Sequence, residues 1–202
     1  MIIIGISGGS GSGKTSFIHE LRNTFDEDQL AVISEDNYYK KWELQTMDDH
    51  GVINFDIPEA IDHEALIDDL NKLSRGVTLQ RPEYTFNNVE AIPKIIVVQP
   101  APVCILEGLF IFHRREVSEL LNLKVLIHAR DELKIIRRIN RDQNERNYPI
   151  DDVLYRYQYH VAPAYDNYIR PHIENLDLVI NNNAHFKGAL ALFKAYIREN
   201  NA

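Results

Sequence analysis

Short runs of apolar, mostly β-branched residues recur along the chain and predict the strands of one buried sheet. They occupy residues 1–6, 31–34, 102–106, 123–127 and 176–180. Most residues in each run are apolar, and the few polar residues, such as Lys124 and Asp177, do not alternate regularly with them. That pattern is typical of strands covered on both faces, as in parallel sheets.

Between these runs, apolar residues recur at helical spacing. The segment after residue 15 places Phe17, Ile18, Leu21 and Phe25 on one face of a helix. A helix with Leu66, Ile67, Leu70 and Leu73 on one face is predicted between Asp62 as N-cap and Gly76 as C-cap. Residues 150–169 predict a helix that Pro163 interrupts, and residues 185–198 predict a closing amphipathic helix. Strands that alternate with helices predict an α/β fold, a five-stranded parallel sheet with helices on both faces.

Two segments break this alternation. Residues 77–80 and 95–98 read as paired strands, so residues 78–99 predict a β-hairpin insert on the substrate side. Tyr84 and Phe86 in this insert either stack on a flat ring or pack the hairpin onto the body. Otherwise the chain, residues 1–202, is expected to form a single domain.

Arginines are dense in residues 131–149, which predict a helical lid over a nucleotide. We assign Arg138 and Arg141 to this lid, where they would offset phosphate charge. For Arg130 and Arg137 the preferred interpretation is a solvated helix, with acidic neighbours as local partners. Those neighbours are Asp142 and Glu145.

Composition narrows the class of protein. The formal net charge of -8 disfavours nucleic-acid polymers as partners, because their binders carry basic patches. No apolar run approaches the length of a membrane span, and Met1–Ile6 is too short for the apolar region of a signal peptide. The single cysteine, Cys104, lies inside an apolar run, which indicates a buried thiol in a reducing compartment. A soluble cytoplasmic protein is expected.

Residues 8–15 fit the phosphate-binding motif G-x-x-x-x-G-K-[ST], and they lie between a predicted strand and a predicted helix. Glycines let the backbone curl so that its N–H groups and the helix N-terminus face phosphate oxygens. Lys14 would reach the β- and γ-phosphates, and the Thr15 hydroxyl would bind Mg²⁺. The predicted nucleotide-binding set is Gly8, Gly9, Ser10, Gly11, Ser12, Gly13, Lys14, Thr15 and Ser16.

Carboxylates follow two of the predicted strands, at the edge where α/β sheets bind ligands. Asp36 is the candidate catalytic group, because a kinase needs a carboxylate facing the acceptor hydroxyl. Glu107 is a candidate Mg²⁺ ligand, together with Thr15 and Asp36. Beside Asp36, Glu35 either contributes to the site or is a solvated charge. Tyr38 and Tyr39 either line the site or simply pack.

Six motifs in order give the chain a family resemblance from residue 2 to about residue 181. They are residues 5–15, 36–40 (DNYYK), 54–58 (NFDIP), 82–84 (PEY), 106–108 (LEG) and 137–146 (RRINRDQNER). With these motifs the chain resembles the uridine kinases, in the P-loop family that also includes phosphoribulokinase and pantothenate kinase. The resemblance implies ATP- or GTP-dependent phosphorylation of a ribonucleoside 5′-hydroxyl, which converts uridine or cytidine to UMP or CMP in pyrimidine salvage. It also suggests a homo-oligomer.

The resemblance assigns roles to single positions. Asp36 matches the catalytic carboxylate near the ribose 5′-hydroxyl, Glu107 the acid of the Mg²⁺ site, and Arg141 a lid arginine at the phosphates. Two pairs complete the set. Tyr39 and Tyr84 match aromatic residues around the nucleoside, and Asp56 and Arg138 match groups that hold the ribose hydroxyls, a suitable pairing for a vicinal diol.

Three positions depart from the family pattern where the pyrimidine ring is read, namely Val89, Tyr148 and Arg156. The identity of the base therefore stays open, since polar groups in a site decide such discrimination. A relative acting on another acceptor, such as nicotinamide riboside or a sugar phosphate, is one alternative. A nucleotide-driven switch or regulator is another, although no N/T-K-x-D run for reading guanine is present.

Overall fold

Five parallel strands form the central sheet of the protein, in the order β2-β5-β1-β6-β7. The structure, a computed structural model, describes residues 1–85 and 92–201. The strands are β1 (Ile2–Ser7), β2 (Leu30–Ser34), β5 (Val103–Glu107), β6 (Leu123–His128) and β7 (Leu178–Asn181). All the predicted strands of this sheet are present, and the parallel pairing confirms the predicted fold class.

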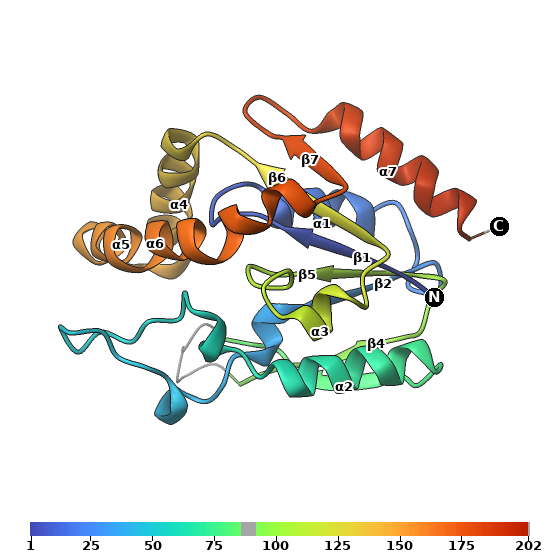
Figure 1. Cartoon of the computed structure of the whole chain (residues 1–202), viewed down its shortest axis with the longest axis horizontal. Coiled ribbons are helices and arrows are strands. Elements are labelled where there is room, and N and C mark those ends of the chain that lie inside the picture. Colours follow the sequence, from blue (N-terminus) through green and yellow to red (C-terminus); the bar gives the residue numbers. More distant parts are fainter. Residues whose placement is uncertain (86–91, 202) are drawn as a thin grey trace.

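Helices cover both faces of the sheet (Figure 1). One face packs against α1 (Lys14–Arg22) and α7 (Lys187–Glu199), where the ring of Phe17 meets those of Phe186 and Phe193 edge-on. The other face packs against α2 (His63–Ser74) and α3 (Arg115–Ser118). Asp62 caps α2 as predicted, since its carboxylate accepts a hydrogen bond from the Ala65 N–H at 3.0 Å.

The carboxyl ends of three neighbouring strands meet at one edge, on the left in Figure 1. Glu107 at the end of β5 lies level with Ser34 on β2 and with Ile6 on β1. The chain continues from β1 into the glycine loop and from β2 into a short 3-10 turn, η1 (Glu35–Tyr38). Parallel pairing therefore brings the two predicted chemical motifs and Glu107 to the same place.

A long connection joins η1 to α2 and carries two further 3-10 turns, η2 (Trp42–Leu44) and η3 (Pro58–Ala60). After α2, β3 (Leu79–Pro82) and β4 (Ile95–Val98) pair antiparallel as a separate two-stranded sheet. The predicted hairpin is thus present. Two predicted positions, Phe86 and Val89, lie outside the described residues.

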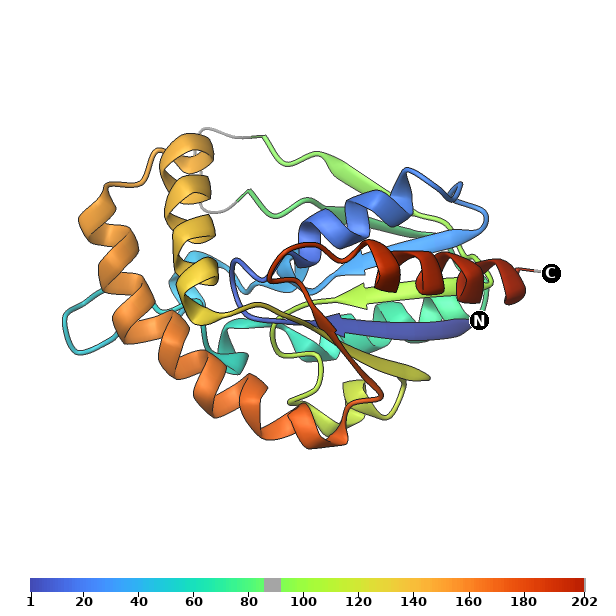
Figure 2. The same cartoon turned by 90° about the horizontal axis from the view of Figure 1, so that it is seen from above.

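The prediction that Pro163 interrupts a helix is wrong. After α4 (Asp131–Arg146), one continuous helical segment extends from residue 150 to residue 175 (Figure 2). It consists of α5 (Ile150–Arg156), the π-helical η4 (Tyr157–Val161), α6 (Ala162–Ala164), the π-helical η5 (Tyr165–Ile169) and the 3-10 turn η6 (Arg170–Asn175). Wider π turns on both sides of Pro163 accommodate a residue that lacks an N–H, so the helix continues.

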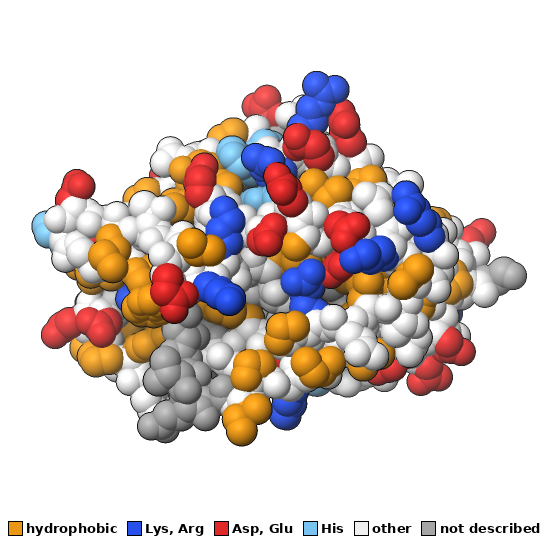
Figure 3. Space-filling model, turned by 90° about the horizontal axis from the view of Figure 1, so that it is seen from below, with side chains coloured by type: hydrophobic (Ala, Val, Ile, Leu, Met, Phe, Trp, Pro, Cys, Tyr) orange, Lys and Arg blue, Asp and Glu red, His pale blue; other side chains and the backbone are white. Residues whose placement is uncertain are grey.

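Two predictions from composition can be compared with the structure. Cys104 is fully buried in β5, and burial raises the pKa of its thiol to about 12, so the thiol stays protonated. Among the described residues, none of the helices has the length and apolar character needed to cross a bilayer. Acidic and basic side chains are interspersed over the face shown in Figure 3.

Candidate active site

The glycine loop joins β1 to α1 and is held in a conformation that only glycine adopts easily. Gly11 and Gly13 have φ angles of 79° and 100°. A Cβ on Gly11 would meet the backbone of Lys134, and one on Gly13 would meet the side-chain amide of Asn182. The amide of Asn182 also donates to the Ser12 carbonyl at 2.8 Å, so the residue after β7 fixes the loop from outside.

Lys14 begins α1 and turns back over the loop, with its Nζ donating to the Gly8 carbonyl at 2.7 Å. Burial lowers the pKa of Lys14, and the nearby carboxylates of Glu107 and Asp36 oppose that shift. The Oγ of Ser12 is buried and has no hydrogen-bond partner among the described residues. A buried cation, an unpaired hydroxyl and a helix N-terminus in one loop suit a polyphosphate.

Ser34 links the carboxylate of Glu107 to the backbone of Asp36. Its hydroxyl donates to Glu107 Oε1 at 2.5 Å, and its Oγ accepts from the backbone N–H of Asp36 at 3.4 Å. Burial raises the pKa of Asp36 to about 7, Glu107 adds to the shift, and Lys14 opposes it. A carboxyl group with a pKa near neutral pH is suited to accept a proton from an alcohol.

A divalent cation would fit between these residues only if a bound ligand supplied further oxygen atoms to coordinate it. Within residues 1–85 and 92–201, His, Cys, Asp and Glu side chains form no cluster of three or more that could hold a metal ion. Mg²⁺ is commonly bound by one or two protein oxygens together with phosphate oxygens and water. Thr15, Glu107 and Asp36 could supply such a partial set, and their assignment as metal ligands stays a prediction.

Aromatic side chains gather beyond Asp36. The rings of Tyr39 and Tyr84 lie 4.8 Å apart, and Phe55 meets Tyr39 edge-on at 5.8 Å and Trp42 at 6.0 Å. The hairpin is tied to this corner because the Tyr84 N–H donates to Asn37 Oδ1 at 3.0 Å. The result is an apolar surface on which a planar ring could stack.

Asp56 follows this aromatic group and faces several cations. Burial raises the pKa of its carboxyl group, while Arg138, His160 and Arg156 favour the charged form. Asp56 is thus held in a partly dehydrated position, where the charges of Arg138 and Arg156 favour its ionised form. Its assignment to the ribose hydroxyls stays a prediction.

Helix α4, the predicted lid, contacts the glycine loop. Arg138 Nη1 donates to Ser10 Oγ at 2.9 Å, and Arg141 lies nearby. The carboxylate of Asp142, which is 1% exposed, forms ion pairs with Arg138, Arg141 and Arg146. Sequence reasoning treated Asp142 only as a local partner on a solvated helix, whereas it organises the arginines of the lid.

The assignment of Arg137 to a solvated helix face is wrong. Arg137 is half-buried and donates to the Asn182 carbonyl at 3.0 Å, because α4 lies against the end of β7. For Glu35, the alternative of a solvated charge is excluded, since Glu35 is 1% exposed and accepts a hydrogen bond from the Phe110 N–H at 2.8 Å, with His63 Nε2 at 3.6 Å. Arg130 is exposed, as expected.

Tyr38 and Tyr39 have different surroundings, although they are adjacent. Tyr38 is buried, donates to Asp69 Oδ2 at 3.0 Å and packs under the guanidinium of Arg81, so it belongs to the core. Tyr39 lies beside Tyr84 in the cleft, which Tyr38 also borders. Which of two neighbouring tyrosines joins the core depends on the direction of the 3-10 turn, and the sequence does not reveal it.

One cleft of about 1140 Å³ joins the phosphate end to the aromatic end. Its walls include every described residue to which a catalytic or acceptor role is assigned, namely Lys14, Asp36, Tyr39, Asp56, Tyr84, Arg138 and Arg141. The candidate metal ligand Glu107 also lines the cleft. Tyr148 and Arg156, two of the positions that depart from the family pattern, line the same cleft. Sequence reasoning missed Trp42, Phe55 and Asn182, although the place of Asn182 directly after a parallel strand was a usable signal.

A strand, a glycine loop with Lys14-Thr15 at a helix start, and a parallel sheet define the class of P-loop nucleotide-binding proteins. Residues 3–187 match the model of the phosphoribulokinase/uridine kinase family. The chain belongs to this family.

Similar proteins agree with this membership. A protein of Clostridium novyi (strain NT) described as uridine kinase is 34% identical over 198 residues, 98% of this chain and 95% of the relative. A protein of Lactobacillus helveticus with the same description is 35% identical over 180 residues, 89% and 85% of the two chains. The fold resembles a possible uridine kinase of Bacillus stearothermophilus (TM-score 0.60, 19% identity, 88% and 87% covered). It also resembles a proposed fructose transport system kinase of Silicibacter sp. TM1040 (TM-score 0.68, 18% identity, 88% of each chain).

Proposed function

We propose that this protein is a nucleoside kinase that transfers the γ-phosphoryl group of ATP to the 5′-hydroxyl of a ribonucleoside. Uridine and cytidine are the proposed acceptors and UMP and CMP the products, as in pyrimidine salvage. The observation that carries the proposal is the single cleft in which the glycine loop, Asp36 and the pair Tyr39 and Tyr84 all take part. Relatives described as uridine kinase, which match nearly the whole chain, support the choice of acceptor.

The residues of the loop hold the donor in this mechanism. Backbone N–H groups and Lys14 bind the phosphates, and Arg141 approaches from the lid, so negative charge that spreads over the transferring group is offset. Asp36 orients the acceptor hydroxyl and takes its proton late in the transfer. Thr15 and Glu107 would help to hold a Mg²⁺ ion, which would neutralise part of the charge of the phosphates.

The aromatic end of the cleft receives the nucleoside. Asp56 and Arg138 bind the ribose hydroxyls through charge-assisted hydrogen bonds, and the base stacks near Tyr39 and Tyr84. Arg156 is available as a polar group at this end, although its Nη1 already donates to the Ile53 carbonyl at 2.9 Å. GTP as an alternative donor, a cytoplasmic location and a homo-oligomeric state belong to the same proposal.

An acceptor panel tests the function. Purified protein with ATP and Mg²⁺ is incubated with uridine, cytidine, nicotinamide riboside or a sugar phosphate, and the phosphorylated product is separated and quantified. We expect uridine and cytidine to give the highest kcat/KM. Activity on nicotinamide riboside or a sugar phosphate without activity on either pyrimidine nucleoside would overturn the choice of acceptor. ATP hydrolysis that no acceptor changes would favour a switch.

A further inference from the structure

A small turn in the connection before α2 leads directly to Asp56. Met47 and Ile53 pair as an antiparallel bridge, and between them Gly51 takes a φ angle of 75°. The Asp48 N–H donates to the Val52 carbonyl at 2.9 Å and closes the turn. Directly after this turn, the Asp56 N–H donates to Asn54 Oδ1 at 2.9 Å. The position of Asp56 therefore depends on where this turn is anchored.

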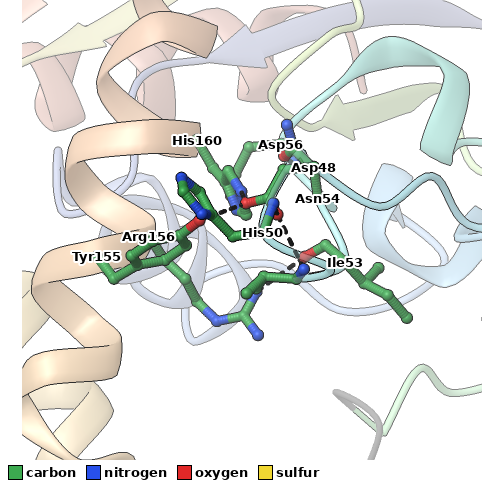
Figure 4. A network of polar contacts seen from close by, with 9 residues as sticks. Asp48, His50, Ile53, Asn54, Asp56, Tyr155, Arg156 and His160 are labelled. Atoms are coloured by element: carbon green, nitrogen blue, oxygen red, sulfur yellow. Dashed lines mark hydrogen bonds and ion pairs between the residues drawn. The ribbon is translucent and has the colours of Figure 1, made fainter.

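The carboxylate of Asp48 is that anchor (Figure 4). Its Oδ1 accepts from the backbone N–H groups of His50 and Val52, each at 2.9 Å, inside the turn. Its Oδ2 is 2.7 Å from both the Tyr155 hydroxyl and His160 Nε2, which lie on the helical segment after the lid. One carboxylate thus closes the turn and also attaches it to a helix that lies more than 100 residues later in the chain.

The π turn explains why both helix residues reach one oxygen. Residues five apart in an α-helix lie about 140° from each other around the axis, because each residue adds about 100°. Between Tyr155 and His160 the helix changes to π geometry, in which i→i+5 hydrogen bonds bring residue i+5 back over residue i. The irregular turn therefore places the hydroxyl and the imidazole on the same side.

A third contact from the same helix grips the turn. Arg156 Nη1 donates to the Ile53 carbonyl at 2.9 Å. His160 is 2% exposed, and its Nδ1 has no hydrogen-bond partner in the described part of the chain, so its ring is fixed mainly through Nε2. Partial burial acts to raise the pKa of Asp48, but hydrogen bonds from Tyr155, Val52 and His160 outweigh it and hold that pKa well below its ordinary value. The carboxylate thus stays charged.

The helix that anchors the turn is also joined to α4 by a short link. α5 follows α4 after a short link around Asn147, and α4 carries Arg138 and Arg141. The charge of Arg156 acts on Asp56 together with that of Arg138. Anchoring the turn to α5 therefore fixes the acceptor side of the cleft relative to the arginines that face the donor.

We propose that Asp48, Tyr155 and His160 are positioning residues that lock the acceptor loop, residues 45–57, to the helix after the lid. Their effect is to hold Asp56 where it binds the acceptor, so they set acceptor affinity without touching the acceptor. This role rests on the proposed nucleoside kinase function. Nothing in the contacts reaches the glycine loop, so binding of ATP should be independent of the lock.

Two substitutions break the lock with little change of volume. Asp48→Asn replaces the charged acceptor, and Tyr155→Phe removes one hydroxyl. The chain supplies matched controls, because Asp49 is exposed in the same turn and Tyr159 is exposed on the same helix. Asp49→Asn and Tyr159→Phe repeat the chemical change one residue or one turn away. His160→Gln, combined with Asp48→Asn, tests whether the two act as one unit.

The only tryptophan of the chain, Trp42, gives a readout that needs no catalysis. It lies in η2, just before the acceptor loop, and is 52% exposed, with its ring 6.0 Å from that of Phe55 in the loop. Acrylamide quenching of its fluorescence should increase by about half or more in Asp48→Asn and Tyr155→Phe, while both controls match the wild type.

In steady-state kinetics with the best acceptor of the panel, the KM of that acceptor should rise about tenfold in Asp48→Asn, the size expected from a lost charge-assisted hydrogen bond. The KM of ATP should change by less than about twofold.

The outcomes separate the two proposals. Unchanged quenching in both lock variants overturns the lock, whatever the acceptor is. Increased quenching with an unchanged acceptor KM overturns the positioning role, since the loop is then anchored without effect on Asp56. If wild-type protein phosphorylates a different acceptor from uridine or cytidine, only the choice of acceptor fails, and the lock is judged with the acceptor that works.

Discussion

Arg138 on α4 donates a hydrogen bond from Nη1 to the hydroxyl of Ser10 at 2.9 Å. Helix α4, the predicted lid, therefore contacts the glycine loop directly. Asp142 makes this arrangement stable, because its buried carboxylate lies among arginines that would otherwise repel one another. A cluster of positive charge is thereby assembled at the loop before a nucleotide arrives, which reduces the rearrangement needed during transfer.

Arg141→Ala should lower kcat by about 100-fold while the thermal midpoint changes little, because a half-buried arginine that faces transferring charge acts mainly in the transition state. Steady-state kinetics with saturating acceptor measures this. Arg130→Ala is the matched control, since Arg130 is an exposed arginine that precedes the same helix, and it should behave like the wild type. Equal losses in the two variants would remove Arg141 from the mechanism.

Asp36→Asn should lower kcat by about 100- to 10,000-fold, the range that a positioned general base contributes. The amide keeps the size of the side chain, so ATP binding, measured by calorimetry, should stay within a few-fold of the wild type. Near-normal kcat in this variant would show that another group accepts the proton of the hydroxyl.

The pKa of Asp36 predicts how the activity changes with pH. Burial, reinforced by Glu107 and opposed by Lys14, raises that pKa to about 7. A base works only when deprotonated, so kcat/KM of the acceptor should rise with pH up to about 7 and level off above it. The rising limb should disappear in Asp36→Asn. A wild-type profile that is flat between pH 5.5 and 8 would contradict the assignment.

The same shift links Asp36 to stability. The folded state binds the proton more tightly than the unfolded state, whose carboxyl group titrates near 3.8, so stability falls as pH rises from about 4 to 7. Without nucleotide, Asp36→Asn should therefore match the wild type in thermal midpoint at pH 4 and exceed it by a few degrees at pH 8. Thermal scans at both values measure it. An advantage already present at pH 4 would point to a different cause.

Much of the fold followed from local sequence signals. The five mainly apolar runs became the strands of the sheet, and Asp62 capped its helix, because a run of apolar residues and a capping side chain are both local features of the sequence. The meeting of the glycine loop with Asp36 was also predictable, since parallel strands end at one edge. The roles assigned to those residues stay predictions.

Features that depend on distant contacts were not predictable in this way. Pro163 sits in a helix that continues because π turns adjust around it, and no local signal announces a π turn. Glu35 is buried because Phe110, 75 positions later, presents a backbone N–H to it. Asp142 and Asp48 look like surface acids in sequence, yet each joins groups from separate elements. Charge alone does not reveal which acids are partnered.

Gly13→Ala should weaken nucleotide binding strongly. Gly13 has a φ angle of 100°, and a Cβ there would meet the side-chain amide of Asn182, so the loop must shift away from the residue that fixes it. Backbone strain of this kind costs about 1–3 kcal/mol, which corresponds to roughly 5- to 150-fold in affinity if the loop recovers its shape only when ATP binds. Gly188→Ala is the matched control, because Gly188 lies exposed in α7 with no atom near the added methyl group, and it should raise the thermal midpoint slightly. Calorimetric titration with ATP and Mg²⁺, beside thermal scans, measures both variants. Unchanged ATP affinity in Gly13→Ala would mean that the loop does not grip the phosphates in the conformation described.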